Sequence, residues 1–571
     1  MSIPRPEYPR PDLVRKEWLN LNGSWDFAFD FGASGREREL EWTHKIIVPF
    51  CPESELSGIG YRDFMNCVWY RRTFQVPESW RDRRVILHFG AVDYQAEVWL
   101  NGRSIGTHRG GYSSFSFEIT DYLQEGENTV VICAEDDTRR QLQPRGKQSA
   151  RFQSHGCDYT RITGIWQTVW LEAVPRTHLA SLKLKPDLKN GRIHISGQLD
   201  SGEGKITAKA YFKCSKVAEE TILAGRHFQF SMTLNEVHPW EPGNPNLYDL
   251  ELEVEGEDGS SDHVSSYFGL RDISWHDGLR INGKKVFMRL VLDQGYYPDG
   301  LYTAPSDEEL KADILRAMEM GFNGARLHQK VFEPRFLYWA DKLGYLLWGE
   351  HGSWGLSLDK PEALRIFLPE WREIMKRDQN HPAIIGWCPL NETRPGPHRG
   401  HQQEFVRAVW EFTKEFDPTR PVIDTSGYTH VATDMYDVHD YDQDPESFSQ
   451  RYQDFLEGKK VFVNYPEVEQ YQGQPYWVSE YGGIWWQPDN PDEKAWGYGK
   501  RPQSEEEFLQ RYRALTTTLL KNPKLCGFCY TQLYDIEQEV NGLYTYRRQP
   551  KFPKEVIREI NTQPAAFEEG E

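Results

Sequence analysis

Short runs in which apolar and polar residues alternate fill the first part of the chain, and this pattern predicts β-strands. Residues 25–29, 84–89 and 127–133 are examples, and turn-forming residues separate such runs. The run 96–100 ends in Asn-Gly, the pair typical of a tight hairpin turn. Many short strands at this spacing predict a jelly-roll β-sandwich over residues 1–178.

A second all-β pattern follows and covers a shorter stretch of the chain. Its strand-like runs include residues 192–196, 207–212 and 248–254. About ninety residues of short strands is the size of an immunoglobulin-like sandwich. We predict that fold over residues 179–273.

From residue 281 the apolar pattern alternates between helix and strand periods. Ser306 and Glu309 have the spacing of a capping box, and an apolar helical stripe follows and ends before Gly321. Further helices are expected near residues 333–342, 363–376 and 404–416. Eight strand-like runs alternate with the helices: 286–292, 322–328, 345–350, 383–392, 421–424, 437–441, 475–483 and 525–530. Eight parallel strands close naturally into a (β/α)₈ TIM barrel, which we predict over residues 274–571.

Composition narrows the classes of function and partner. A net charge of -19 over 571 residues argues against nucleic acid or an anionic membrane as a partner. Aromatic residues make up 14% of the chain, which suits carbohydrate binding because a sugar ring stacks on an aromatic face. The chain has no apolar run long enough to span a bilayer, and its first residues lack the apolar core of a signal peptide, so we expect a cytoplasmic protein.

Neither cysteines nor acidic clusters make a strong case for a metal. Eight cysteines in this length do not form a disulfide framework. Cys526 and Cys529 form a C-x-x-C inside a strand-like run, which favours core thiols over a zinc or redox site. Three aspartates could be a calcium cluster, but a solvated acidic loop is the favoured interpretation: Asp437, Asp440 and Asp442. We predict no metal and no cofactor.

Two of the strand-like runs end in a glutamate. The run 383–390 is followed by Asn391 and Glu392, and the run 475–479 by Glu480. In a parallel barrel, a carboxylate at the C-terminal end of a strand lies on the catalytic rim. A retaining glycosidase needs two such groups, a protonated acid beside the leaving oxygen and an ionised nucleophile about 5–5.5 Å away. Single glutamates at strand ends are common, so the hypothesis depends on the pair.

Motifs along the whole chain resemble glycoside hydrolase family 2, which includes many β-galactosidases, β-glucuronidases and β-mannosidases. Glu392 and Glu480 fall where that family keeps its acid/base and its nucleophile. The other matching motifs are the runs 18–25, 99–102, 110–112, 164–166 and 268–271, together with Asn323 and Arg326. The resemblance implies a retaining, exo-acting glycosidase that acts on a small oligosaccharide or glycoside. Whether the chain forms a homo-oligomer is left open.

The resemblance also implies the roles of individual residues. Glu392 would be the general acid/base, with a pKa raised in the free enzyme by the charge of Glu480. Glu480 would attack the anomeric carbon. Asn391 would bind the sugar 2-hydroxyl, and Arg326 would hold Glu480 ionised.

Further side chains are expected to line the sugar site. Tyr441, or alternatively His439, would donate a hydrogen bond to Glu480. The signature of the second barrel strand departs from the family pattern, so that either His328 serves as its histidine or Gln329 replaces it. Residues at other predicted strand ends would shape the subsite for the terminal sugar: Asp293, Glu350, Trp485 and Trp486.

Two departures from the family pattern bear on the substrate. β-Glucuronidases of the family recognise the uronate carboxylate with Asn-x-Lys before a glycine, but here Glu539 and Asn541 occupy those positions. Because Glu539 would repel a carboxylate, we predict a neutral sugar, a β-galactoside first and an α-L-arabinofuranoside second. The first barrel strand ends at Asp293, unlike the Asn-Arg-His-Glu of well-known β-galactosidases, which indicates a less familiar branch. The alternative from another class is a non-hydrolytic carbohydrate-binding protein, which loss of either Glu392 or Glu480 would have indicated.

Overall fold

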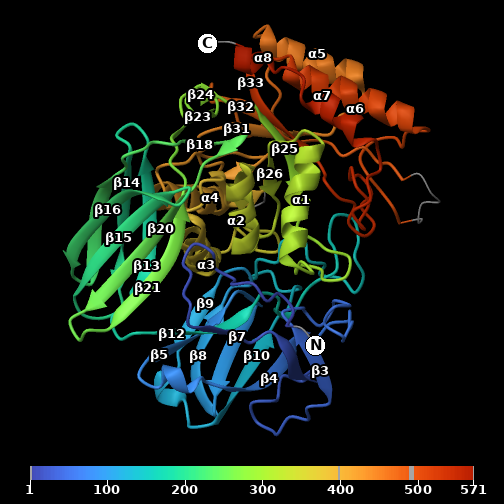
Figure 1. The fold of residues 1–571 in the computed structure, drawn as a ribbon. Helices are drawn as coiled ribbons and strands as arrows, with labels where there is room; N and C mark the ends of the chain where they lie inside the picture. The colour runs from blue at the N-terminus through green and yellow to red at the C-terminus, as the bar shows by residue number, and fades with distance from the viewer. Residues whose placement is uncertain (1–2, 396–398, 488–493, 570–571) are drawn as a thin grey trace.

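The structure is a computed structural model, and it describes residues 3–395, 399–487 and 494–569. Figure 1 shows one β-sandwich in blue, a second in green and a larger α/β body in yellow to red. Within the described residues, no helix is both long enough and apolar enough to cross a membrane.

The first sandwich pairs a four-stranded sheet with a six-stranded sheet, and all pairings are antiparallel. Their inner faces share one core, to which Phe27, Leu87 and Val98 contribute. The four-stranded sheet has the order β1 (Trp18–Asn20), β12 (Val169–Val174), β5 (Arg84–Phe89), β9 (Phe115–Glu118). The six-stranded sheet has the order β3 (His44–Val48), β2 (Gly23–Phe29), β4 (Cys67–Gln75), β10 (Glu127–Glu135), β7 (Gln95–Leu100), β8 (Arg103–Arg109). Short elements complete this unit: β6 (Val92–Asp93), β11 (Gly164–Ile165) and the 3₁₀ turns Glu78–Trp80 and Thr120–Tyr122.

The second sandwich is smaller and also antiparallel. It packs Ile195 and Phe228 of one sheet with Ile206 and Leu250 of the other in a separate core. Its sheets are β13 (Leu179–Asp187), β14 (Arg192–Leu199), β17 (His227–Thr233), and β16 (Ser215–Ala224), β15 (Gly204–Phe212), β20 (Tyr248–Gly256), β21 (Ser261–Phe268). A small hairpin of β18 (Trp240–Glu241) and β19 (Asn244–Pro245) lies between β17 and β20 in the chain. Three short strands lead from this sandwich into the barrel: β22 (Ile273–Ser274), β23 (Arg280–Ile281) and β24 (Lys284–Lys285).

The third unit is a curled parallel sheet with helices around it, as the TIM barrel prediction requires. In the described chain its strand order is β28 (Ile384–Cys388), β27 (Leu346–Glu350), β26 (Gly324–Leu327), β25 (Met288–Asp293), β33 (Leu525–Thr531), β32 (Tyr476–Gly482), β31 (Tyr436–Asp440). The helices are α1 (Asp307–Glu319), α2 (Pro334–Leu343), α3 (Ala363–Asp378), α4 (Arg399–Phe416), α5 (Pro445–Leu456), α6 (Glu505–Leu520), α7 (Lys554–Asn561) and α8 (Ala566–Glu569). Ser306 caps α1 by accepting from the Glu309 N–H, as the capping box predicted.

The fifth barrel position differs from the prediction of a strand over residues 421–424. Val422 pairs with Trp387 only through an isolated parallel bridge, and the regular pairing resumes between β29 (Leu390–Asn391) and β30 (Thr425–Ser426). Pro421 has no N–H to give, and the N–H of Val422 donates to the Asp434 carboxylate at 2.8 Å. Of Pro421, Val422 and Ile423, only Ile423 donates to the neighbouring strand, through a 2.9 Å hydrogen bond to the Trp387 carbonyl, and the strand is irregular.

One connection of the first sandwich reaches the rim of the barrel. Between β10 and β11, the N–H of Arg145 donates to the carbonyl of Trp354 at 2.8 Å, and that of Gly146 to the carbonyl of Gly352 at 3.0 Å. Gly352 and Trp354 follow the C-terminal end of β27. The first sandwich therefore contributes directly to the edge of the barrel where strand ends meet.

Candidate active site

Parallel strands bring both glutamates of the sequence analysis to one edge of the barrel. Glu480 lies within β32, and Glu392 directly follows β29. Glu392 has a φ of +50°, in the left-handed region that residues other than glycine rarely adopt. Such strain concentrates at functional sites.

A histidine lies between the two carboxylates. Nδ1 of His439, in β31, is 2.9 Å from Glu392 Oε1 and 3.3 Å from Glu480 Oε2. One ligand atom from each of these three residues lies within 4.8 Å of the others. The two glutamates are therefore close enough to act on one bond, with His439 bridging them.

Glu480 is buried, and charged or polar donors satisfy both of its oxygens. Arg326 Nη1 donates to Oε1 at 3.1 Å, and the Tyr441 hydroxyl donates to Oε2 at 2.5 Å. Burial alone would raise the pKa of Glu480, but the charges of His439 and Arg326 beside it lower the pKa overall. The carboxylate is thus held ionised.

Arg326 organises a wider network beneath the pair. Its Nε donates to Glu350 Oε1 at 2.7 Å, and its Nη2 donates to Asn391 Oδ1 at 3.2 Å. Only 1% of the Arg326 side chain is exposed. Asn391 Nδ2 is buried and has no hydrogen-bond partner among the described residues, so it is a donor available to a ligand. The Asn391 carbonyl accepts from the indole N–H of Trp354 at 3.2 Å.

The expectation of a raised pKa for free Glu392 is wrong. Burial raises the pKa, but the hydrogen bond and charge of His439, together with the charge of Lys147, lower it overall. The sequence analysis considered Glu480 alone as the neighbour of Glu392 and placed His439 only as a donor to Glu480. Its position between the two carboxylates reverses the sign of the shift.

His328, and not the side chain of Gln329, faces the pair. His328 Nδ1 is 3.2 Å from Glu350 Oε2 and 3.9 Å from Glu480 Oε1. The Gln329 side chain instead bonds to Ser353 and to the N–H of Trp354. Of the two residues that the sequence left open, His328 is therefore the one whose side chain lies beside the glutamate pair.

Asp293 and Trp485, which were also predicted to line the sugar subsite, make their contacts with residues outside the glutamate pair. Asp293 is buried and accepts from the Gly295 N–H at 2.9 Å. Burial and the charge of Asp313 raise the pKa of Asp293 to about 6. Trp485 is half-buried, and the Arg501 guanidinium lies over its ring. No described hydrogen bond or ion pair joins Asp293 or Trp485 to the glutamate pair.

Glu539 lies near the site and is fully satisfied. The Tyr159 hydroxyl donates to Glu539 Oε2 at 2.6 Å, and Asn541 Nδ2 donates to Oε1 at 3.0 Å. Burial raises the pKa of Glu539, and the charge of Glu480 adds to the effect, while Lys147 opposes it. Glu539 is therefore close enough to Glu480 and Lys147 to influence the charge of the site.

The favoured interpretation of the three aspartates as a solvated acidic loop is wrong for Asp437 and Asp440, which lie buried in β31, whereas Asp442 is a partly exposed loop residue. Asp437 is buried and accepts from Ser426, whereas Asp440 is buried against Arg451. Asp442 also pairs with Arg451, at 3.0 Å. Asp437 thus joins β31 to the end of β30, while Asp440 and Asp442 join the end of β31 to Arg451 of α5.

Metal binding has little support in the described residues. Cys526 and Cys529 are buried free thiols whose pKa values burial raises, as expected for core residues. Glu392, His439 and Glu480 could together hold an ion, but their ligand atoms already bond to one another and to Arg326 and Tyr441. The absence of a metal thus stays a prediction.

Three residues of this region were missed by the sequence analysis. Tyr428 lies near Glu392 and helps to lower its pKa. Trp354 contacts Asn391, and Lys147 comes from the first sandwich. Tyr428 follows Gly427 just after β30, a strand end that could have indicated it; nothing in the sequence connects Lys147 to the barrel.

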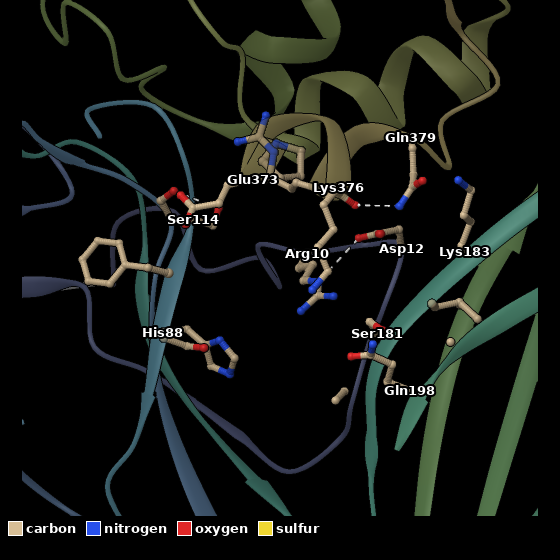
Figure 2. Close-up of a pocket in the computed structure, with 18 of the residues that line it drawn as sticks. Arg10, Asp12, His88, Ser114, Ser181, Lys183, Gln198, Glu373, Lys376 and Gln379 are labelled. Atoms are coloured by element: carbon tan, nitrogen blue, oxygen red, sulfur yellow. Dashed lines mark hydrogen bonds and ion pairs between the residues drawn. The ribbon is translucent and has the colours of Figure 1, made fainter. Parts of the chain in front are cut away.

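A cavity of about 810 Å³ lies elsewhere, where the two sandwiches meet α3 (Figure 2). His88, Ser181 and Lys376 are among its lining residues, and neither Glu392 nor Glu480 is. Arg10 lies 3.8 Å from Asp12 there. The cavity is therefore separate from the glutamate pair.

A known protein family and solved structures share this three-part architecture. Sequence models of glycosyl hydrolases family 2 match three successive stretches: the sugar binding domain over residues 58–175, a second domain over 177–271 and the TIM barrel domain over 280–488. Among solved structures, a β-D-glucuronidase of Dictyoglomus thermophilum superposes with a TM-score of 0.78 at 21% identity, over 98% of this chain and 99% of that one. A β-glucuronidase of Ruminococcus gnavus gives 0.79 at 19% identity, over 98% and 100%. At these identities the likeness is one of fold.

Curated relatives carry two different names. A beta-galactosidase of Thermoanaerobacter pseudethanolicus is 26% identical to this chain. The match covers 82% of this chain but only 63% of that protein, so the chain spans less than two thirds of that relative's length. A beta-glucuronidase of Streptococcus agalactiae is 23% identical over 73% of both chains. With three family domains matched in order over most of its length, the chain belongs to glycosyl hydrolase family 2.

Proposed function

We propose that the protein is a retaining exo-glycosidase that removes a terminal neutral sugar by double displacement. One observation carries this proposal: an oxygen of Glu392 and an oxygen of Glu480 lie within 4.8 Å of each other. Retaining enzymes keep their carboxyl groups about 5–5.5 Å apart, whereas inverting enzymes leave about 6.5–9.5 Å for a water molecule. The separation favours direct attack by one carboxylate.

Glu480 is the nucleophile in this proposal. Its lowered pKa keeps it ionised, and Arg326 and Tyr441 orient its two oxygens. Attack forms a bond between a Glu480 oxygen and the anomeric carbon, while the bond to the leaving oxygen breaks.

Glu392 supplies the proton for the leaving oxygen. Its pKa is low in the free enzyme, but a bound sugar displaces water from this partly exposed carboxyl and so disfavours its charged form. Once the glycosyl ester forms, the charge of Glu480 is gone and the pKa of Glu392 falls again. The resulting carboxylate suits a general base that activates water for the second step.

The charges around the pair support a neutral sugar. Four buried or partly buried carboxylates gather here: Glu350, Glu392, Glu480 and Glu539. The cations near them include Arg326, Lys147 and Arg394. A substrate carboxylate would add a fifth negative charge in a desolvated place, at a cost of several kcal/mol. Among neutral sugars, the beta-galactosidase relatives favour a β-galactoside, with an α-L-arabinofuranoside second.

A panel of 4-nitrophenyl glycosides tests this specificity. We expect kcat/KM for the β-D-galactoside to exceed that for the β-D-glucuronide by at least roughly 10²-fold, with the α-L-arabinofuranoside as the second neutral substrate to compare. A preference for the glucuronide would mean that Glu539 does not exclude a uronate.

Substitution of each glutamate should separate the two roles. Glu480→Gln should abolish turnover of every glycoside, because no covalent intermediate can form. Glu392→Gln should lose about 10²–10⁴-fold on glycosides with poor leaving groups, which need a proton, and much less on nitrophenyl glycosides. Rates on both substrate types, with the exposed Glu236→Gln as control, decide this. Equal losses on both types for Glu392→Gln would contradict the assignment.

The pH profile should respond to His439. His439→Phe removes a hydrogen bond and a charge that stabilise both ionised carboxylates, so both pKa values rise. A hydrogen bond to a charged group contributes about 1.5–3 kcal/mol, which corresponds to about 1–2 pH units. The bell-shaped profile of kcat/KM should therefore move to higher pH by that amount, while His263→Phe, exposed on the second sandwich, leaves it in place. A shift to lower pH would contradict this electrostatic account.

A further inference from the structure

A lysine of the first sandwich lies buried beside the barrel site. Lys147 is 6% exposed, and its Nζ is 5.4 Å from the centre of the Trp354 ring and 5.9 Å from that of Tyr159. In the part of the chain that the structure describes, no hydrogen bond or ion pair reaches this ammonium group. An ammonium group has three N–H donors and no acceptor. In a buried position these donors need oxygen atoms that accept their hydrogen bonds.

The two aromatic side chains that flank Lys147 hydrogen-bond to different parts of the site. Trp354 donates to the carbonyl of Asn391, the residue before Glu392. Tyr159 donates to Glu539. The ammonium group therefore lies between the acid/base side of the site and the side of Glu539.

Lys147 is also charged. Burial alone would lower its pKa, but the nearby Cys157 thiol and three surrounding carboxylates raise the pKa overall: Glu539, Glu480 and Glu392. That both catalytic glutamates act on it places the ammonium group in their electrostatic range. It is a cation at neutral pH.

Backbone contacts fix the position of Lys147. The residues before it bond to the barrel through Gly352 and Trp354, and the Tyr159 N–H donates to the Lys147 carbonyl at 2.7 Å. Gly146 has a φ of +57°, and a Cβ there would lie 2.2 Å from the carbonyl oxygen of Gln329. Only glycine fits so close to the barrel, so this loop is seated against the rim.

We propose that Lys147 donates hydrogen bonds to a hydroxyl group of the terminal neutral sugar, so that substrate specificity is divided between the first sandwich and the barrel. The inference rests on the proposed function. The ligand is a hydroxyl and not a carboxylate because Glu539, on the far side of Tyr159, already balances the lysine charge. Lysine and Glu539 together give a subsite of about zero net charge, which suits a polar, uncharged ring.

Deoxygenated substrates identify the contact. The experiment compares wild type and Lys147→Met on 4-nitrophenyl β-D-galactoside and on its 2-, 3-, 4- and 6-deoxy analogues. A hydrogen bond to a charged group is worth about 10–100-fold in kcat/KM, so Lys147→Met should lose that much on the parent galactoside. On one deoxy analogue the variant and wild type should differ by less than about 3-fold, because the hydroxyl that Lys147 contacts is already absent.

Two further variants guard against a folding effect. Lys147→Arg keeps a cationic donor and should recover part of the lost activity on the parent galactoside. Lys45→Met, on the exposed face of the first sandwich, should leave every rate unchanged. Circular dichroism and the melting temperature of each variant report the fold.

The possible outcomes distinguish failure of the Lys147 inference from failure of the proposed function. An equal loss on all substrates, with or without the hydroxyls, means that Lys147 is only structural, and unchanged rates mean that it does not touch the sugar; either overturns this inference alone. A Lys147→Met variant that loses turnover of 4-nitrophenyl β-D-glucuronide selectively shows that the ligand is a carboxylate and overturns it as well. A wild-type protein inactive on every neutral glycoside overturns the proposed function and this inference with it.

Discussion

The buried guanidinium of Arg326 is the interaction on which the site depends. Parallel strands bring several carboxylates to one edge of the barrel, where their mutual repulsion in a poorly solvated place would oppose folding. Arg326 contacts Glu350 and Glu480 and also positions Asn391. Removing one partner of such a buried network typically costs about 3–5 kcal/mol. The same contacts thus fix the orientation of the Glu480 carboxylate.

His439 adds a second constraint, because it shares one nitrogen between two carboxylates. Its Nδ1 lies within 3.3 Å of both Glu392 and Glu480. It lowers the pKa of both carboxylates, so in the proposed mechanism the acid form of Glu392 arises when a sugar displaces water from it.

Much of the fold could be predicted from the sequence, because the apolar period distinguishes strands from helices. The segment at residues 421–424 was the exception: its apolar pattern suits a strand, but Pro421 lacks an N–H and Asp434 takes the N–H of Val422. Pattern alone cannot show such a side-chain competitor, since Asp434 lies twelve residues further along the chain.

The glutamates and Arg326 could be predicted because each lies at or near the end of a strand of its own. The sign of the Glu392 pKa shift could not, because it depends on where the His439 ring points. Lys147 could not be placed either, since a loop of another domain carries it and its position depends on Gly146 fitting against Gln329. Site residues at the ends of barrel strands can be predicted from the sequence. Site residues that another domain brings into contact with the barrel cannot.

The stereochemical course of hydrolysis tests the central claim, that Glu480 attacks the sugar directly. Proton NMR of 4-nitrophenyl β-D-galactoside during the first minutes of turnover resolves the anomeric protons of the released sugar. The account predicts that the β-anomer forms first and that the α-anomer grows in later by mutarotation. Initial release of the α-anomer would contradict it, because a single displacement by water needs no covalent intermediate on Glu480.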